Sequence, residues 1–234
     1  MTTFSLVGTT EPFLHVAMRR GDKIFCESNA MVMMEDTLEL KGRLQGGLAQ
    51  SLLRRFANDE SLFQQHIEAV RGDGDCLLAP TLDGDLQILD VGVRQYTLAD
   101  GAFVAATHGV DVKVKMNSSI GGALFGDNGG FLVMHTGGEG QLVVSGAGSL
   151  FELEVTTGKD VIVDNGHVVC WDSQLQYELS MSTAQNSGFL GNLLNSATSG
   201  EGMVLRFRGH GRIVVCSRNR QNTVTWLHSK LGGS

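Results

Sequence analysis

Apolar and polar residues alternate with a period of two along most of the chain. In Met203–Arg208, for example, Met203, Leu205 and Phe207 fall on one side and the residues between them on the other. Successive side chains of a strand point to opposite faces, so this pattern predicts a strand with one buried face. Similar alternation occurs at 22–26, 110–115, 141–145, 151–155 and 174–179. Turn dipeptides such as Asp83-Gly84 and Asp100-Gly101 separate these segments and predict tight hairpins. We therefore expect an all-β chain.

Three segments of the sequence share one order of features. Each begins with a turn and an apolar strand, and aligning Ala30, Ala102 and His167 superimposes these starts. Each then has an alternating strand, a glycine-rich apolar connection and a Gly-x-Gly turn at 72–74, 138–140 or 209–211, which we expect to close a hairpin. The pattern predicts three repeats of about 70 residues, at approximately 12–90, 91–156 and 157–220, followed by a tail over 221–234.

One repeat of this size cannot bury its apolar sheet face alone. We expect the three repeats to pack around a pseudo-threefold axis and to form one domain over residues 1–234, because no linker-like segment divides the chain. Leu48, Leu52, Leu53 and Phe56 have the spacing of an amphipathic helix, so we expect a short helix near 46–58, the longest in the chain.

The charge of the chain disfavours nonspecific binding of polyanions. The formal net charge is −7, and the field of the whole molecule repels nucleic acid and anionic lipid. Residues 203–234 nevertheless contain no Asp or Glu and carry +6, which leaves −13 on residues 1–202.

The cysteines and the amino terminus indicate a cytoplasmic protein. The four cysteines form no Cys-x-x-Cys pair, and Cys170 and Cys216 lie in apolar runs, so we expect buried free thiols in a reducing compartment. The first residues lack the pattern of a secretory or transit peptide, and no apolar run is long enough to span a membrane.

The sequence resembles the mitochondrial-biogenesis family that is named for altered inheritance of mitochondria in yeast. The resemblance runs from about Pro12 to Arg220 and rests on four motifs in order, at 21–32, 121–126, 164–169 and 200–205. It implies a β-sandwich like that of the tryptophan RNA attenuator protein (TRAP), grouped with double-stranded β-helices, with three internal repeats. It implies no enzyme activity, cofactor or catalytic residue, and likeness of fold does not transfer RNA binding.

The motifs of the sequence assign no catalytic role to any residue. No two of the seven histidines have the His-x-His spacing of a metal site in this fold type. The Gly-x-Gly turns lack the third glycine and the following helix of a dinucleotide loop, and neither a Gly-x-Ser-x-Gly elbow nor a Walker A sequence is present. We expect no enzyme, no metal and no cofactor.

Two candidate interaction surfaces remain. If the strands on either side of Gly209-His-Gly211 form a hairpin, Arg206, Arg208 and Arg212 come together as an anion-binding patch; the alternative is that they pair with acidic residues of the same chain or of a neighbouring subunit. The glycine-rich connections supply a second, apolar patch, which either binds a partner or caps the core. Its residues are Leu48, Leu52, Leu124, Phe125, Phe189, Leu190, Leu193 and Leu194.

These features favour a non-enzymatic scaffold or protein-interaction domain that self-associates and has a protein partner. The alternative is a small-molecule or nucleic-acid binding module that uses a pocket between repeats or the arginine patch, although the net charge disfavours nucleic acid. Contact with a membrane surface has no support beyond the apolar patch.

Overall fold

The structure is a computed structural model that describes residues 1–41, 65–81, 83–117, 131–180 and 203–231. Strands dominate these ranges, and every strand pair is antiparallel, so the predicted all-β sandwich is confirmed. After β1 (Thr3–Val7), the strands fall into three sets of six, which we call units 1, 2 and 3.

Unit 1 contains β2 (Phe13–Met18), β3 (Lys23–Cys26), β4 (Met31–Met34), β5 (Leu38–Lys41), β6 (Gln65–Ala69) and β7 (Gly74–Leu78). Unit 2 contains β8 (Asp85–Val91), β9 (Tyr96–Ala99), β10 (Phe103–Thr107), β11 (Val110–Asn117), β12 (Phe131–Gly138) and β13 (Gly140–Gly146). Unit 3 contains β14 (Leu150–Val155), β15 (Val161–Asp164), β16 (Val168–Asp172), β17 (Gln176–Ser180), β18 (Val204–Arg208) and β19 (Gly211–Cys216), with the short 3-10 helix η2 (Asn165–His167) before β16.

The strands of all three units pair in the same order. The sixth strand of each unit lies between the first and the third, and the fifth lies between the second and the fourth. Each unit therefore consists of two three-stranded half-sheets. Neighbouring units join where the second strand of one pairs with the third strand of the next, as β3 with β10 and β9 with β16. These junctions make two six-stranded sheets from four half-sheets.

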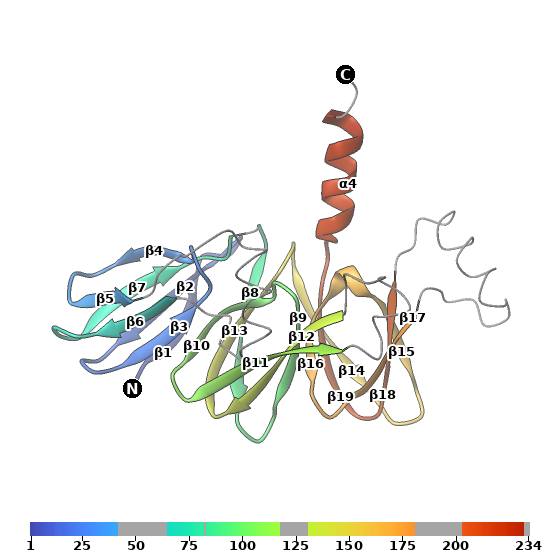
Figure 1. Cartoon of the computed structure of the whole chain (residues 1–234), viewed down its shortest axis with the longest axis horizontal. Helices are drawn as coiled ribbons and strands as arrows, with labels where there is room; N and C mark the ends of the chain where they lie inside the picture. Colours follow the sequence, from blue (N-terminus) through green and yellow to red (C-terminus); the bar gives the residue numbers. More distant parts are fainter. Residues whose placement is uncertain (42–64, 82, 118–130, 181–202, 232–234) are drawn as a thin grey trace, which may run out of the picture.

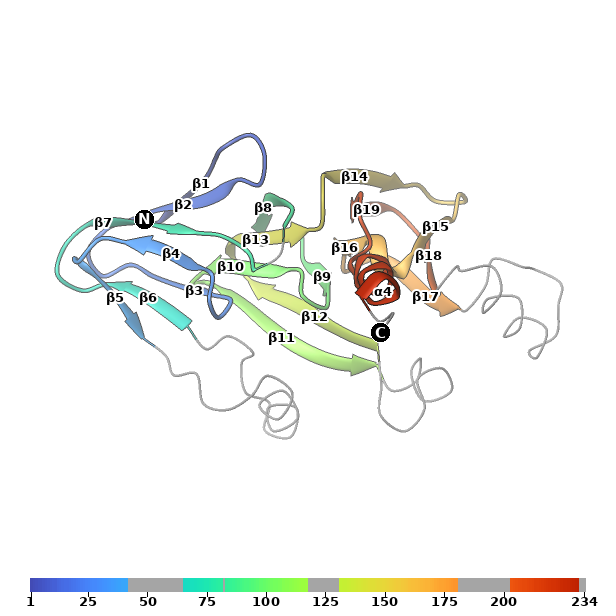
Figure 2. The same ribbon diagram turned by 90° about the horizontal axis from the view of Figure 1, so that it is seen from above.

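The units lie in a row, with unit 1 at one end and unit 3 at the other (Figures 1 and 2). The expected packing around a pseudo-threefold axis is therefore wrong. A closed arrangement needs a third junction, between β15 and β4, but β4 and β15 are edge strands of separate sheets. Each end of the row therefore has one junction strand with an unpaired edge, β4 in unit 1 and β15 in unit 3.

The hydrophobic core is divided among the gaps between successive sheets. One cluster includes Leu14, Ile67 and Val143 and fills unit 1 against the first six-stranded sheet. A second, with Phe103 and Leu98, lies between the two six-stranded sheets, and a third surrounds Trp171 and Phe207 in unit 3. Each six-stranded sheet is buried on both faces, because each contributes residues to two clusters.

The sequence analysis expected the Gly-x-Gly turns to close hairpins, and this prediction is wrong. The strands on either side of 209–211 are β18, which pairs with β15 and β17, and β19, which pairs with β14 and β16. The turns at 72–74 and 138–140 likewise connect strands of different sheets. Gly209 has a φ of +110°, a backbone conformation that favours glycine, and there the chain passes from one sheet to the next.

Within each unit, a hairpin instead joins the fourth and fifth strands, as β5–β6, β11–β12 and β17–β18, and β1 forms a further hairpin with β2. The connections inside the three unit hairpins contain the predicted apolar patch and the predicted helix near 46–58, which lie outside the described residues. The segment expected to form a C-terminal tail, 221–234, is mostly helical, because α4 (Arg220–Leu231) occupies most of it. This helix stands out from the row of sheets (Figure 1).

Candidate functional site

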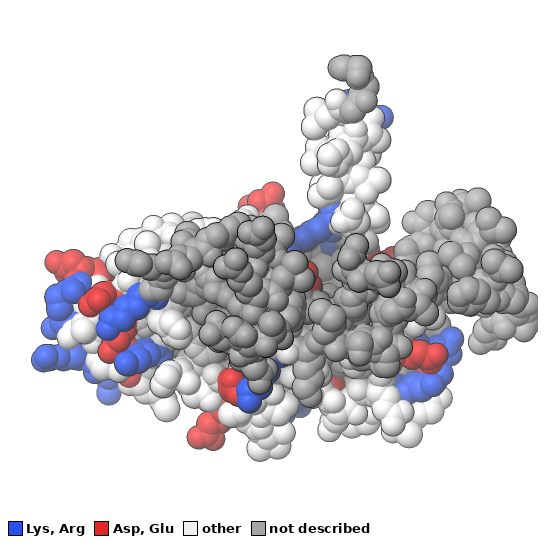
Figure 3. Space-filling view, in the orientation of Figure 1, with Lys and Arg blue, Asp and Glu red and all other residues white. Residues whose placement is uncertain are grey.

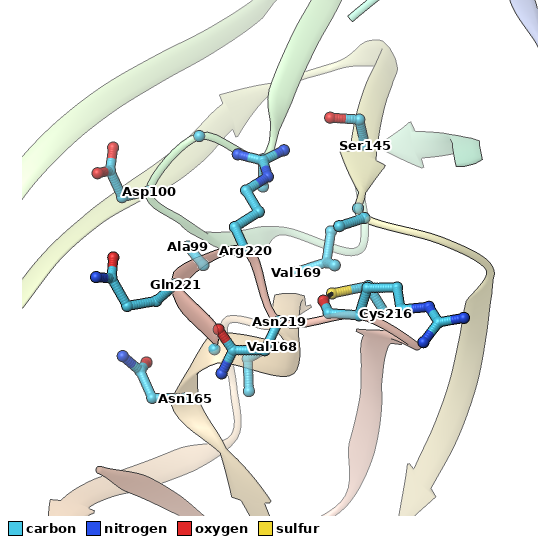
Figure 4. A pocket seen from close by; sticks show the side chains of 16 residues that line it. Ala99, Asp100, Ser145, Asn165, Val168, Val169, Cys216, Asn219, Arg220 and Gln221 are labelled. Carbon is cyan, nitrogen blue, oxygen red and sulfur yellow. Dashed lines mark hydrogen bonds between the residues drawn. The ribbon is translucent and has the colours of Figure 1, made fainter. Parts of the chain in front are cut away.

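A cavity of about 420 Å³ lies where units 2 and 3 meet at the base of α4. Small residues form much of its wall, from the β9–β10 turn, the end of β13 and the start of β16. Gly101, in the β9–β10 turn, has a φ of +72°, and a Cβ there would lie 2.9 Å from the Arg220 guanidinium. Figure 4 shows the Arg220 side chain extending from α4 toward the turn that carries Asp100. The polar groups around the cavity are those of Asp100, Ser145, Asn165, Arg218, Asn219, Arg220 and Gln221.

Asn219 fixes the start of α4 at this cavity. Its Oδ1 accepts a hydrogen bond from the Asn222 N–H at 3.2 Å, and its backbone oxygen accepts one from the Thr223 N–H at 3.2 Å. This is the geometry of a helix N-cap. Its Nδ2 also donates to the Asp164 carboxylate at 3.2 Å, which attaches the helix to the end of β15.

Two titratable groups have raised pKa values, Cys216 in the cavity lining and Glu27, which interacts electrostatically with Arg220. Burial raises the pKa of Glu27, and the positive charge of Arg220 partly offsets that effect. Burial also raises the pKa of the Cys216 thiol, which donates a hydrogen bond to the Arg218 carbonyl at 3.2 Å. The thiolate is the nucleophilic form of cysteine, so Cys216 is poorly suited to nucleophilic catalysis.

The predicted arginine patch is divided into two sites. Arg206 and Arg208 lie on β18 beside Asp160, at 3.6 and 2.8 Å, and Arg208 also lies 3.7 Å from Glu178. Arg212 lies on β19 and pairs with Glu152 of β14 at 2.9 Å. The expected hairpin does not form, so the cluster is not assembled as predicted. Its three positive charges face three carboxylates of the same chain, which is the alternative that the sequence analysis left open.

The described part of the chain also contains no group of three or more His, Cys, Asp or Glu residues placed to hold a metal ion. All four cysteines are buried and free, as the sequence predicted.

Comparison with known proteins identifies the family. The model of the family described as Mitochondrial biogenesis AIM24 matches residues 4–218. The chain belongs to this family. A relative, an uncharacterised protein of Streptococcus pyogenes serotype M6, is 33% identical over 214 residues, which cover 89% of this chain and 82% of the relative.

The crystal structure of another Streptococcus pyogenes protein has a similar fold. Its TM-score to this chain is 0.81 at 29% sequence identity, and the match covers 99% of this chain and 100% of that one. The resemblance to the AIM24 family noted in the sequence is therefore confirmed over nearly the whole chain.

In this AIM24 family member, helix α4 is exposed from Gln221 to Leu231, and Arg220 at its start is partly exposed. None of its residues is buried, and the face visible in Figure 3 is mostly uncharged. Among the described helices, none has the length and apolar content needed to cross a membrane.

The sequence analysis did not identify Arg218, Asn219 or Arg220 as a group at one cavity. The available signal was the block from residue 203 onward that lacks Asp and Glu, which contains both arginines. Their convergence depends on how β19 leads into α4, which a strand pattern does not predict.

Proposed function

We propose that this protein is a non-enzymatic scaffold that works by self-association. The observation that carries the proposal is the location of exposed apolar side chains. Val32 and Met33 on β4 are 53% and 42% exposed, and Ile162 on β15 is 42% exposed. These strands lie at opposite ends of the row of sheets (Figure 1). Exposed apolar residues at strand edges are typical of surfaces that bind other protein chains.

The chemistry of the described residues supports a role without catalysis. Burial raises the pKa of the Cys26 and Cys76 thiols to about 12, so neither is a thiolate at neutral pH. At the cavity, the arginines and amides can hold an anion, but the groups around it do not form a nucleophile and base pair of the kind that catalysis requires.

We place the protein in the cytoplasm, because four free buried thiols suit a reducing compartment. The likeness to TRAP stays a prediction and carries no RNA-binding activity with it. The internal pairing of Arg206, Arg208 and Arg212 further disfavours nucleic acid as a partner.

Light scattering of the purified protein tests the proposal. A mass that is a multiple of the 25.1 kDa chain supports a self-associating scaffold. A mass of one chain at every concentration contradicts it.

The cavity at the base of α4 favours a second candidate function, the binding of a small anion. Arg218 and Arg220 supply two positive charges in the cavity lining, which contains one carboxylate, that of Asp100, while Glu27 outside the lining also interacts with Arg220. Inorganic phosphate should then raise the melting temperature of the wild-type protein, and an Arg218→Gln, Arg220→Gln variant should lose that response. An equal response in both proteins argues against this function.

A further inference from the structure

The two ends of the row are complementary halves of one sheet. In both internal junctions, the half-sheet formed by the fourth, fifth and second strands of one unit meets the half-sheet formed by the third, sixth and first strands of the next. At the end of unit 3, the half-sheet β17–β18–β15 exposes the edge of its second strand. At the end of unit 1, β4 is the exposed edge of a sheet in the order β4–β7–β2–β1.

The third strands of the units share a local distortion as well as a position. The pairing of β4 with β7 shifts between Met31 and Met33, leaving Val32 as the extra residue. The pairings of β10 and β16 shift in the same way at Val104 and Val169. At the first junction, the Val104 carbonyl accepts a hydrogen bond from the Glu27 N–H at 2.8 Å. The β4 edge therefore has the same bulge that faces a partner strand inside the chain.

Side chains that are buried at both internal junctions are exposed at the two ends. Val104 and Val169, the equivalents of Val32, are 0% and 2% exposed, whereas Val32 is 53% exposed. Phe25 and Thr97, which correspond to Ile162, are 8% and 1% exposed, whereas Ile162 is 42% exposed. The chain thus has apolar residues at junction positions that its own fold leaves uncovered.

The edge strands β4 and β15 also have few of the charged residues that, on most other edge strands, oppose pairing with another chain. The edge strands β5, β8, β11, β14 and β17 each contain a charged residue within the strand. β4 contains none, β15 has only Asp164 at its end, and β1 is the one other uncharged edge among the described strands. Charged residues on an edge oppose pairing with another chain, and β4 and β15 offer little such opposition.

We infer that β15 of one molecule pairs with β4 of a second copy, an inference that rests on the proposed self-association and specifies its contact. The partner is another molecule, because β4 and β15 of one chain lie at opposite ends of the row (Figure 1). Such a contact is head-to-tail, and repeating it gives a ring or a filament.

The internal junctions also fix the register of this contact. Ala105 pairs with Cys26 and Ala106 with Phe25 at the first junction, and Cys170 pairs with Leu98 and Trp171 with Thr97 at the second. The equivalent pairs are Met33 with Val163 and Met34 with Ile162 of the second copy. Ile162 then packs on the core of the second copy's unit 1, as Phe25 packs on the core of unit 2.

Two variants that each block one edge test this inference by complementation. Ile162→Lys places a charge on the β15 edge and leaves β4 intact, whereas Met33→Lys does the reverse. Both positions are exposed in the single chain, so the monomer should fold normally, which circular dichroism and thermal melting check. Phe151→Lys is the matched control, because Phe151 is 65% exposed but lies on β14.

Light scattering should show wild-type protein and Phe151→Lys at the same multiple of the 25.1 kDa chain mass. Each edge variant alone should fall to the mass of one chain, and an equal mixture of the two should form a dimer and nothing larger, because only one productive contact remains.

Two outcomes overturn the head-to-tail contact while leaving the scaffold proposal intact. In one, both edge variants assemble as the wild type does. In the other, a single variant still forms dimers by itself, which indicates pairing between identical edges. A monomeric wild-type protein overturns both the contact and the proposed function.

Discussion

The side-chain amide of Asn219 donates a hydrogen bond to the carboxylate of Asp164 across 55 residues of sequence, at 3.2 Å. Asp164 ends β15, and Asn219 directly precedes α4. The same Asn219 side chain accepts the Asn222 N–H, so one residue both begins the helix and holds it against unit 3. None of the α4 residues is buried, which makes this cap a large part of what stabilises the helix.

Replacing Asn219 by alanine should therefore loosen α4. Loss of an N-cap costs about 1 kcal/mol, which corresponds to a roughly fivefold increase in helix opening. Hydrogen exchange of the α4 amides, followed by mass spectrometry, measures this change. Asn222→Ala is the control, because the cap uses only its backbone N–H. Unchanged α4 exchange in Asn219→Ala would show that the cap does not hold the helix.

A methyl group at Gly146 should destabilise the junction of units 2 and 3. A Cβ there would lie 2.6 Å from a Leu150 methyl, 2.7 Å from Cys216 Cβ and 2.7 Å from a Val169 methyl. Overpacking of this kind costs roughly 1–3 kcal/mol, so the urea midpoint of Gly146→Ala should fall. The control is Gly92→Ala, where the nearest atom to an added Cβ is Glu139 Cβ at 3.8 Å. Equal midpoints for the two variants would contradict this account of the packing.

The sequence contained enough information for the strands and for their equivalence between units. Aligning Ala30, Ala102 and His167 places Val32, Val104 and Val169 at one position, and in the structure these are the extra residues of three matching bulges. The alternating pattern predicted the buried faces because burial on one side of a strand follows directly from side-chain direction.

Strand partners could not be predicted in the same way. Alternation shows which face of β18 is buried, but the hydrogen bonds of β18 lie in the plane of the sheet and leave no pattern in the sequence. The turn at Gly209-His-Gly211 was therefore interpreted as a hairpin, although it leads to another sheet. Helix α4 was missed because Thr223, Val224 and Thr225 are β-branched and no apolar stripe faces a core.

Stability should decrease in alkaline solution because of the buried thiols. Burial raises the pKa of Cys26 and Cys76 from 9.0 to about 12 in the folded protein. Between these pH values the unfolded chain loses the thiol protons and the folded chain keeps them, so the free energy of unfolding falls as pH rises. Below pH 9.0 this contribution is fully present.

Urea midpoints across this pH range measure the effect. A Cys26→Ala, Cys76→Ala variant should be less stable at neutral pH but should lose stability more gradually above pH 9.0. Some slope should remain, because burial also raises the pKa values of Cys170 and Cys216. Parallel slopes in the two proteins would exclude Cys26 and Cys76 as the cause.

Removing the Asp160 carboxylate should create a cationic surface that the wild-type protein lacks. The hydrogen bond from Arg208 is the main cause of the lowered pKa of Asp160, and Arg206 adds to it. Asp160→Asn should therefore elute from heparin at higher salt than wild type. Asp111→Asn changes the net charge equally but frees only Lys113, which lies 3.1 Å away. If the two variants elute together, net charge alone accounts for the shift.

Self-association should persist at high salt if it uses the strand edges. The charge difference between residues 203–234 and the rest of the chain suggests ionic association, but Arg206, Arg208 and Arg212 already pair within the chain. Contacts made by Val32, Met33 and Ile162 depend on apolar burial and backbone hydrogen bonds, which salt screens little. Light scattering at about 0.05 M and about 0.5 M salt should therefore give the same mass, whereas ionic contacts would weaken as the Debye length shortens. Dissociation at high salt would assign the association to charged residues. Within the described residues 203–231, Arg218, Arg220 and Lys230 would then be the first candidates, because the other three cations of that segment already pair with carboxylates.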